Sequence, residues 1–405
     1  MALTLDSSYQ RIPIDELPLG RPLKGPVYDD NSDILLVAAG TMLTKTVQTA
    51  LRRRGISHVR IGSQDLRPSR NSRSRIMTAP REEEEPPASR WSNGKPPFLK
   101  LHTKTMSNPG KSPLVDKFTE QLSQSVVRAG EVFTSLAKGQ LVSSNMVMEM
   151  IQSCRAQLTE DIDLFVALGA GANTDQYPIS HSLQTARLAM AIAAVMGVDQ
   201  SSLMDIGAGC VLHDVGMLRV APELLNTERP LDIIEKLDVT KHPAYSFEML
   251  KNVPDLPVGA RMIAYQMHER LDGSGYPRKV GGPLIHVYSR IAMVADTFVA
   301  MTSPRPHRAE ILPHYVMLEI LEEAAAGRFD RAVIKGLLDT VSMFPLGSHV
   351  ELSNGNVGNV LRANPGCYTR PIIESWNPAT PEQKEIVDLK ERLDLEVVRP
   401  LYGTG

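Results

Sequence analysis

The sequence is poor in cysteine, with only Cys154, Cys210 and Cys367 among 405 residues. These lie far apart and form no CxxC pair, which excludes a disulfide framework and a zinc knuckle. The net charge of −2 gives no global field that would attract nucleic acid or an anionic membrane. No apolar run is long enough to cross a bilayer, and the opening MALTLDSSYQ lacks the basic start and apolar core of a signal peptide. We therefore expect a reduced, cytoplasmic protein that binds neither nucleic acid nor membrane.

The chain contains segments of different character, and its length predicts two or three domains. Residues 1–66 combine a short apolar run, a helical segment and the strand-like SHVRI, which predicts a small α+β accessory domain. Residues 67–112 are rich in proline, serine and arginine and contain few apolar residues. Such a segment cannot bury enough surface to fold alone, so we expect a disordered linker.

The remaining chain predicts a mainly α protein. Residues 113–345 have helical spacing throughout, which indicates an all-α domain. Residues 346–375 change to short apolar runs around SNGN, a hairpin turn signal, and predict a short β segment. Residues 376–405 are charged, and we expect a C-terminal tail that either packs against the body or stays loose.

Polar side chains interrupt the apolar helical stretches. His181 shares a helical face with apolar residues, His213 ends another apolar stripe, and Asp214 follows it. Each histidine alone is better explained as a core residue that donates a hydrogen bond to a carbonyl. The carboxylates are harder to explain, because burying one without a partner is costly. No lysine or arginine lies within one helical turn of Asp296, which argues against a local ion pair.

Two more histidines complete a set of four histidines and two aspartates: His181, His213, Asp214, His242, His268 and Asp296. This combination of nitrogen and oxygen ligands suits divalent transition metals, and six side chains are too many for one tetrahedral zinc site. We predict two divalent ions about 3.5–4 Å apart, with Asp214 as the bridging carboxylate and water in the open positions. Iron or manganese is the expected metal, and zinc stays open as an alternative. The positive charge of such a site suits an anionic phosphate substrate.

The H…HD…D pattern at His181, His213-Asp214 and Asp296 resembles the HD superfamily of metal-dependent phosphohydrolases. The stretches HDVGML, KHPAYSFEML, HERLDGSGYP and VADTFVAMTSPRPHR resemble its HD-GYP branch in order and approximate spacing, over roughly residues 175–310. The stretch LSNGNVGNVLRANP resembles the β segment that often follows this domain, and the N-terminal unit resembles a small accessory domain that often precedes it. The resemblance therefore implies an all-helical HD-type phosphohydrolase domain with a small domain on each side.

The resemblance also implies an activity, the hydrolysis of cyclic di-GMP to linear pGpG or to GMP. A hydroxide held between the two metals would attack phosphorus, with His213 and Asp214 as the catalytic residues and His242 and His268 as ligands of the second metal. Guanidinium groups would bind phosphate. The substrate-binding residues that the resemblance implies are Gly275, Tyr276, Arg305 and Arg308. Signalling proteins and a second copy of the chain are candidate partners besides cyclic di-GMP.

Three positions depart from the HD-GYP pattern. Met217 stands where the family has a lysine, which removes a cation near the phosphate, and Met267 replaces a histidine, which predicts a weaker second metal site. Tyr177 stands where some members have a glutamate for a third metal, so we expect no third metal. The alternative hypothesis is a catalytically weakened module that signals by binding cyclic di-GMP or a protein. A third, an HD hydrolase of another nucleotide, is disfavoured by the GSGYP loop.

Overall fold

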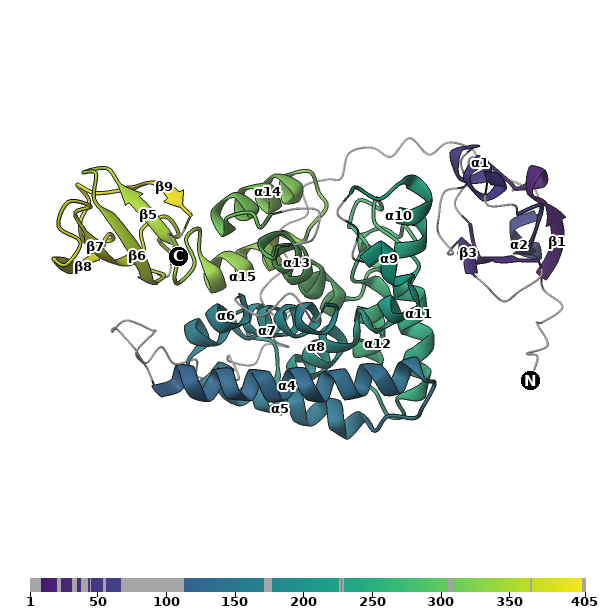
Figure 1. The fold of residues 1–405 in the computed structure, drawn as a ribbon, viewed down its shortest axis with the longest axis horizontal. Coiled ribbons are helices and arrows are strands. Elements are labelled where there is room, and N and C mark those ends of the chain that lie inside the picture. Colours follow the sequence, from purple (N-terminus) through teal and green to yellow (C-terminus); the bar gives the residue numbers. More distant parts are fainter. Residues whose placement is uncertain are drawn as a thin grey trace.

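The computed structural model describes residues 9–66, 113–170 and 177–402, apart from 20–22, 31–34, 38–42, 44, 54–55, 226, 228, 305–308 and 365. The predicted linker at 67–112 and the predicted substrate residues Arg305 and Arg308 lie outside the described residues. Figure 1 shows a small N-terminal unit, a helical body and a C-terminal sheet in succession. The predicted fold class, mainly α with a small α+β unit before the helices and a β segment after them, is confirmed.

The N-terminal unit is a four-stranded antiparallel sheet in the order β1-β4-β2-β3, with helices packed against it. Its core contains Val27, Val59 and Ile61, which are fully buried. Its elements are β1 (Tyr9–Pro13), η1 (Ile14–Glu16), β2 (Val27–Asp29), β3 (Leu35–Val37), α1 (Lys45–Arg53), β4 (His58–Gly62) and α2 (Ser63–Leu66).

The body is built from helices, as predicted. They are α4 (Pro113–Ala137), α5 (Ser144–Glu160), α6 (Ile162–Ala170), α7 (Ile179–Val195), α8 (Gln200–Leu212), α9 (Pro222–Leu225), α10 (Ile233–Val239), α11 (His242–Met249), α12 (Val258–Gln266), α13 (Val287–Thr302), α14 (Pro313–Ala325) and α15 (Arg331–Val341), with short 3₁₀ turns η4 (Val215–Arg219), η5 (Leu250–Asn252) and η6 (Gly282–Leu284). Helix α7 is buried along its whole length from Ser180 to Ala194. A helix buried on every side must be apolar or small all round, and the alanine-rich run ARLAMAIAA meets this need. Helices α8 and α13 pack against α7. Helix α8 ends directly before the predicted ligands His213 and Asp214, and α13 contains Asp296.

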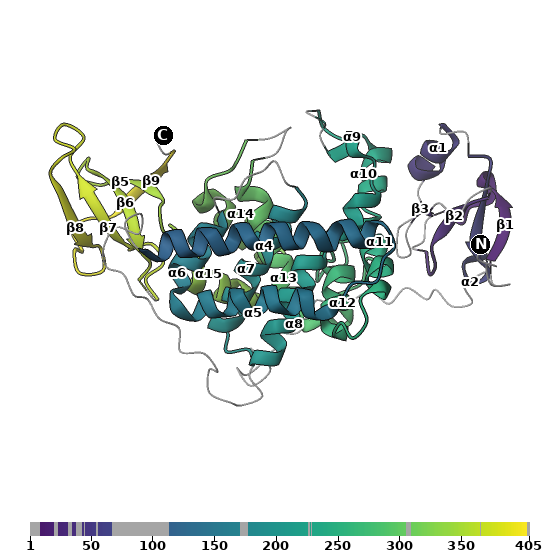
Figure 2. The same ribbon diagram turned by 60° about the horizontal axis from the view of Figure 1, so that its bottom comes forward.

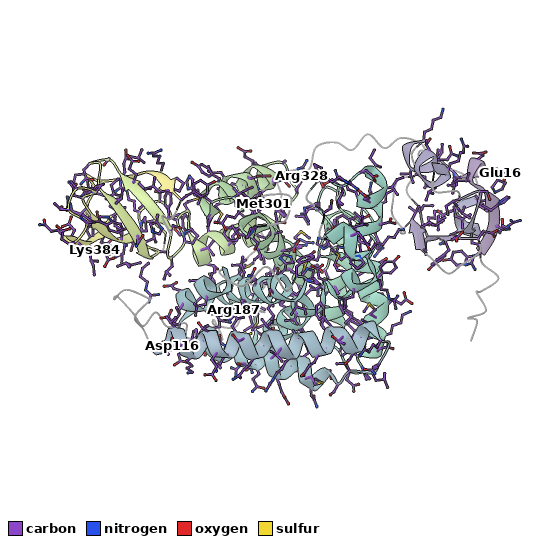
Figure 3. The ribbon with its side chains drawn as sticks, in the orientation of Figure 1. Glu16, Asp116, Arg187, Met301, Arg328 and Lys384 are labelled. Atoms are coloured by element: carbon purple, nitrogen blue, oxygen red, sulfur yellow. The ribbon has the colours of Figure 1, made fainter. Side chains whose placement is uncertain are left out.

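One cation lies inside this apolar packing. Arg187 of α7 is 1% exposed and its place in the body is marked in Figure 3. Its guanidinium donates to the Phe165 carbonyl, at 2.7 Å from Nη2, and to Gln157 Oε1 at 2.9 Å, and it lies 4.0 Å above the Phe165 ring. Burial lowers the pKa of Arg187 to about 10, so it remains charged at neutral pH. These bonds fix α7 to α5 and α6.

The C-terminal part corrects the prediction of a charged tail from 376 onward. The sheet has five antiparallel strands in the order β8-β7-β6-β5-β9, and β8 and β9 both lie in the supposed tail. The strands are β5 (His349–Leu352), β6 (Val357–Arg362), β7 (Ile372–Trp376), β8 (Lys384–Asp388) and β9 (Val397–Leu401). Strand β8 buries only Val387 while Lys384 and Glu385 are exposed. Its charged composition therefore hid a strand that is held by backbone pairing with β7.

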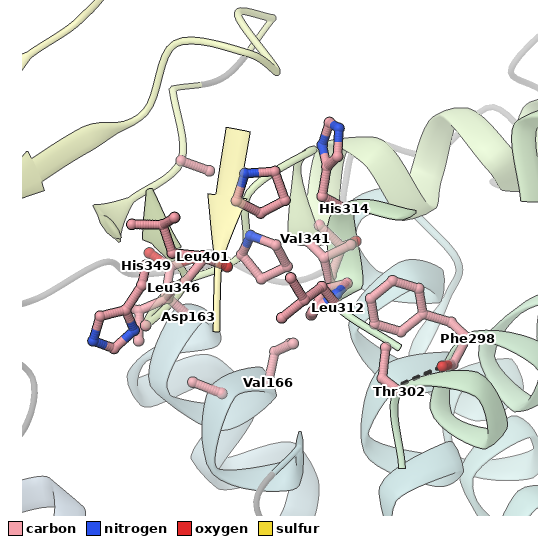
Figure 4. Close-up of a pocket in the computed structure, with 18 residues that line it drawn as sticks. Asp163, Val166, Phe298, Thr302, Leu312, His314, Val341, Leu346, His349 and Leu401 are labelled. Carbon is pink, nitrogen blue, oxygen red and sulfur yellow. Dashed lines mark hydrogen bonds between the residues drawn. The ribbon is translucent and has the colours of Figure 1, made fainter. Parts of the chain in front are cut away.

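The sheet is joined to the helical body by buried ion pairs and by shared apolar packing. Arg362 of β6 pairs with Asp163 and, at 3.4 Å, with Asp161 at the start of α6. Beside this junction lies a cavity of about 280 Å³, which Phe298 and Thr302 of α13 and His314 of α14 line together with residues of the sheet. Figure 4 shows that it opens between the helices and the sheet. None of the six predicted metal ligands lines it. Among the described helices, none combines the length and apolarity needed to cross a membrane.

Candidate metal centre

The six predicted ligands lie in different elements and converge on one place in the helical body. They are His181 in the first turn of α7, His213 and Asp214 directly after α8, His242 at the start of α11, His268 after α12, and Asp296 in α13. All are buried except His268, whose side chain is 14% exposed. Two sets of three have ligand atoms within 4.8 Å of one another: His181, His213 and Asp296, and His213, Asp214 and His268. His242 Nε2 lies 2.9 Å from His268 Nε2, so the structure brings the whole predicted set together.

The two carboxylates lie between the histidines. Asp296 Oδ1 is 2.9 Å from His181 Nε2, and Asp296 Oδ2 is 3.5 Å from His268 Nδ1. Asp214 Oδ1 is 3.2 Å from His213 Nε2 and 3.3 Å from His242 Nε2. Asp214 Oδ1 therefore lies close to two imidazoles, one directly after α8 and one at the start of α11. A ligand shared by two metals needs this arrangement.

Backbone carbonyls fix the orientation of two of these imidazoles. His213 Nδ1 donates to the Cys210 carbonyl at 2.7 Å, and His242 Nδ1 donates to the Val239 carbonyl at 2.8 Å. Since a carbonyl only accepts, the proton belongs on Nδ1 and Nε2 of each ring is directed at the centre. His213 Nε2 is buried without a hydrogen-bond partner of good geometry, although Asp214 Oδ1 lies 3.2 Å and Asp296 Oδ1 3.7 Å away. A buried nitrogen without a hydrogen-bond partner, facing two carboxylates, fits a metal ion.

The electrostatics of the centre keep His242 and His268 neutral and Asp214 charged, as metal ligands must be, but they favour a protonated His213. Burial lowers the pKa of His242, and it lowers the pKa of His268 to about 3, so both rings are neutral at neutral pH. Burial alone would raise the pKa of Asp214, but His213 beside it holds that pKa well below its usual range. Burial would likewise lower the pKa of His213, yet the carboxylates of Asp214 and Asp296 raise it to about 9.

Metal binding should therefore release a proton from His213. The metal-free ring is protonated below a pH of about 9, and a metal ligand must be deprotonated. Below about pH 9 the affinity for the metal should therefore rise with pH, because less of the ring is protonated, and above that pH it should level off. Titration calorimetry at pH 7.5 in two buffers of different ionisation enthalpy should give different binding heats. The difference should correspond to about one proton released to the buffer when the first metal binds. Equal heats in the two buffers would contradict a charged His213.

Two small residues, Gly216 and Ser246, hold η4, which follows Asp214, close to α11, which begins with His242. Ser246 Oγ on α11 donates to the His213 carbonyl at 2.5 Å and accepts from the Gly216 amide at 2.8 Å. A Cβ on Gly216 would lie 2.2 Å from the His242 carbonyl oxygen. Only glycine allows η4 to approach α11 this closely, so Gly216 and Ser246 set the spacing between Asp214 and His242. The sequence analysis missed both roles, although Gly216 lies within the HDVG motif that it quoted.

The GSGYP loop is packed against His268. The Tyr276 ring stacks on the His268 ring with centroids 4.9 Å apart and an interplanar angle of 11°, and the Tyr276 amide donates to the His268 carbonyl at 2.9 Å. Glu269 is fully buried and accepts from the amides of Arg278, at 2.8 Å, and Val280, at 3.2 Å. Glu269 thus holds the returning arm of the loop, a role that the sequence analysis did not assign.

The three departures from the family pattern have distinct surroundings. Met217 is 4% exposed in η4, one turn after Asp214, and Met267 is fully buried in the main hydrophobic core beside His268. The Tyr177 hydroxyl donates to Asp214 Oδ2 at 3.5 Å, and its ring lies 5.9 Å from that of His181. The predicted effects of the two methionines on activity and on the second metal stay predictions.

Comparison with known proteins agrees with this geometry. The family model described as "HD domain" matches residues 168–333. A cyclic di-GMP phosphodiesterase of Pseudomonas aeruginosa is 25% identical over 64% of this chain and 63% of its own length. A 3′3′-cGAMP-specific phosphodiesterase of Vibrio cholerae is 34% identical over 39% of this chain and 36% of its own length. A solved HDG"Y"P protein of Bdellovibrio bacteriovorus is 13% identical, with a TM-score of 0.47, over 82% of this chain and 98% of that one.

Residues 168–333 therefore form an HD domain, as the H…HD…D pattern predicted. The two curated relatives are each matched over less than two thirds of their own length.

Proposed function

We propose that the protein is a metal-dependent phosphodiesterase that hydrolyses cyclic di-GMP to linear pGpG, with GMP as the product of a second cleavage. The convergence of six histidine and aspartate side chains in one buried place carries this proposal. The names of the relatives support a cyclic dinucleotide as the substrate class.

The residues present fit two divalent ions. His181, His213 and Asp296 would hold one ion, and Asp214, His242 and His268 would hold the other, with Asp214 shared between them. When bound, such ions polarise a phosphoryl oxygen and lower the pKa of a water. Iron or manganese suits this ligand set best.

The chain itself would orient and shield the reacting groups. The carbonyls of Cys210 and Val239 keep the rings of His213 and His242 in one tautomer and one orientation. The Tyr276 ring covers one face of His268 and excludes water from it. Gly275 and Tyr276 would form the mouth of the site, and Arg305 and Arg308 would contact the phosphates.

The decisive experiment is turnover of cyclic di-GMP by protein purified without oxygen, with metal content measured on the same sample. Because some relatives are named for 3′3′-cGAMP, that dinucleotide should be assayed in parallel. Two metals per chain together with pGpG formation support the proposal. Two bound metals without hydrolysis of either dinucleotide would overturn it.

The alternative, a weakened module that binds cyclic di-GMP and signals by contact, is favoured by Met217, which puts an apolar side chain where the family has a lysine, and by Met267, which replaces a histidine. It predicts tight binding of cyclic di-GMP with no turnover by protein that holds both metals. The two buried carboxylates favour the enzyme. Burying a carboxylate is costly, and a site that performs no chemistry would gain little from that cost.

Met217→Lys should raise kcat by about 10²–10³-fold, the usual value of one charge contact made in the transition state, with KM little changed. Met217→Gln, which adds polarity without charge, is the matched control and should stay near wild type. Both variants must be compared at equal metal content, since an ammonium group beside Asp214 also repels the ions. An unchanged kcat in the lysine variant would show that the missing cation does not limit turnover.

A further inference from the structure

Helix α10 is weakly supported by the helical body. It has seven residues, Ile233–Val239, and buries none of them. A helix this short is unstable alone, because nucleation costs more than so few hydrogen bonds return. A capping box between Asp232 and Glu235 stabilises its first turn. Its last turn needs support from elsewhere.

The N-terminal unit supplies that support. Among the described elements, α1 is the main packing partner of α10, and Figures 1 and 2 both show the two helices side by side. Leu237 of α10 packs against the hydrophobic core of the N-terminal unit, which includes Val47 and Leu51 of α1.

The last turn of α10 in turn positions a predicted metal ligand. The carbonyl of Val239, the final residue of α10, accepts the Nδ1 hydrogen bond of His242 at 2.8 Å. Lys241, which joins α10 to α11, is 4% exposed and its Nζ lies 2.7 Å from Asp238 Oδ1 of α10. Leu237 and Val239 are two residues apart, so a displacement of the Leu237 turn moves the carbonyl that orients His242.

We propose that the N-terminal unit, residues 9–66, controls the metal centre by docking on α10 through Leu237. Docked, it keeps the Val239 carbonyl in place and His242 Nε2 directed at the centre. Undocked, α10 loosens and His242 loses the acceptor that fixes its tautomer. This inference rests on the proposed metal centre. The N-terminal unit is then an internal regulator of the metal centre. A ligand or protein that competes with α10 for the surface of α1 would displace the unit.

The test compares Leu237→Gln with Ile233→Gln in the full chain. Both changes remove an aliphatic side chain from α10 without adding charge, but Ile233 is 55% exposed and lies outside the N-terminal core. Amide hydrogen exchange over residues 45–53 and 233–249 reports docking, and calorimetry with Mn²⁺ in the absence of substrate reports the centre. Leu237→Gln should speed exchange in both segments and weaken one Mn²⁺ site about 10–100-fold, as loss of a group that orients a ligand usually does. Ile233→Gln should match wild type in both measurements.

Three results would overturn the proposal. Unchanged exchange in Leu237→Gln would show that this contact does not hold the unit, and faster exchange with unchanged Mn²⁺ affinity would show that docking is not coupled to His242. Equal effects of both variants would trace the change to α10 itself. If wild type binds no Mn²⁺, the proposed function fails first, while the exchange measurement still decides whether docking orders α10 and α11.

Discussion

Asp214→Asn should lose metal from the proposed centre and reduce the proposed turnover of cyclic di-GMP by about 10³-fold or more, the order found when a central catalytic group is removed. One oxygen of Asp214 lies 3.2 Å from His213 Nε2 and 3.3 Å from His242 Nε2, so it is placed to be the shared ligand of the two proposed ions. An amide keeps the shape but removes the negative charge, and an uncharged group holds a dication less well. Metal analysis of the purified variant, together with product chromatography, would measure both effects.

The matched control is Asp205→Asn on α8. It makes the same chemical change at a half-buried carboxyl whose pKa is raised by burial and which belongs to neither set of clustered ligands. This variant should keep its metals and its activity. Retention of two metals per chain in Asp214→Asn would rule out the bridging role.

Gly275→Ala should disturb the predicted mouth of the site although it adds only a methyl group. Its Cβ would lie 2.4 Å from the Arg270 amide nitrogen and from the Cα of Glu269, and backbone atoms cannot move aside cheaply. The loop must shift, and the Tyr276 ring with it. A misplacement of about 1 Å near the chemistry costs on the order of 10²-fold in rate, so kcat/KM should fall by about that factor.

Gly281→Ala is the control for this effect, because its Cβ would meet nothing nearer than the Leu271 carbonyl at 3.6 Å. It lies in the same loop region and has an ordinary backbone conformation. We expect wild-type kinetics from it, and metal content close to wild type in both variants. Equal kinetics for Gly275→Ala and wild type would remove Gly275 from the predicted substrate-binding set.

The helices, and the six side chains that the structure brings together, could be predicted because each rests on a local pattern. Amphipathic spacing gave the helical body, and buried carboxylates such as Asp296 indicated the centre because burial without a partner is costly. The supporting contacts could not be predicted, because they join segments far apart in the chain. Ser246 meets His213 across 33 positions, and Arg187 meets Phe165 across 22. Serine and arginine carry no sequence signal for such pairings.

The last strands and the N-terminal contact escaped prediction for related reasons. Strand β8 has one buried side chain, so its composition is that of a solvated tail, and its pairing with β7 uses backbone groups that the sequence does not distinguish. Leu237 is one leucine among many in a helical region. Only its position against the N-terminal core separates it from a leucine of the helical body.

The separation of His181 and Asp296 by 115 positions has a consequence for folding. Nε2 and Oδ1 are 2.9 Å apart in the folded chain but belong to distant segments of an unfolded one, so a metal ion that uses both can bind only the folded form. By mass action, the free energy of that binding adds to the free energy of unfolding. Each tenfold rise in free metal above the dissociation constant would add about 1.4 kcal/mol per site. The amount of folded protein in a cell would then follow the supply of metal, and scarcity would lower both activity and abundance.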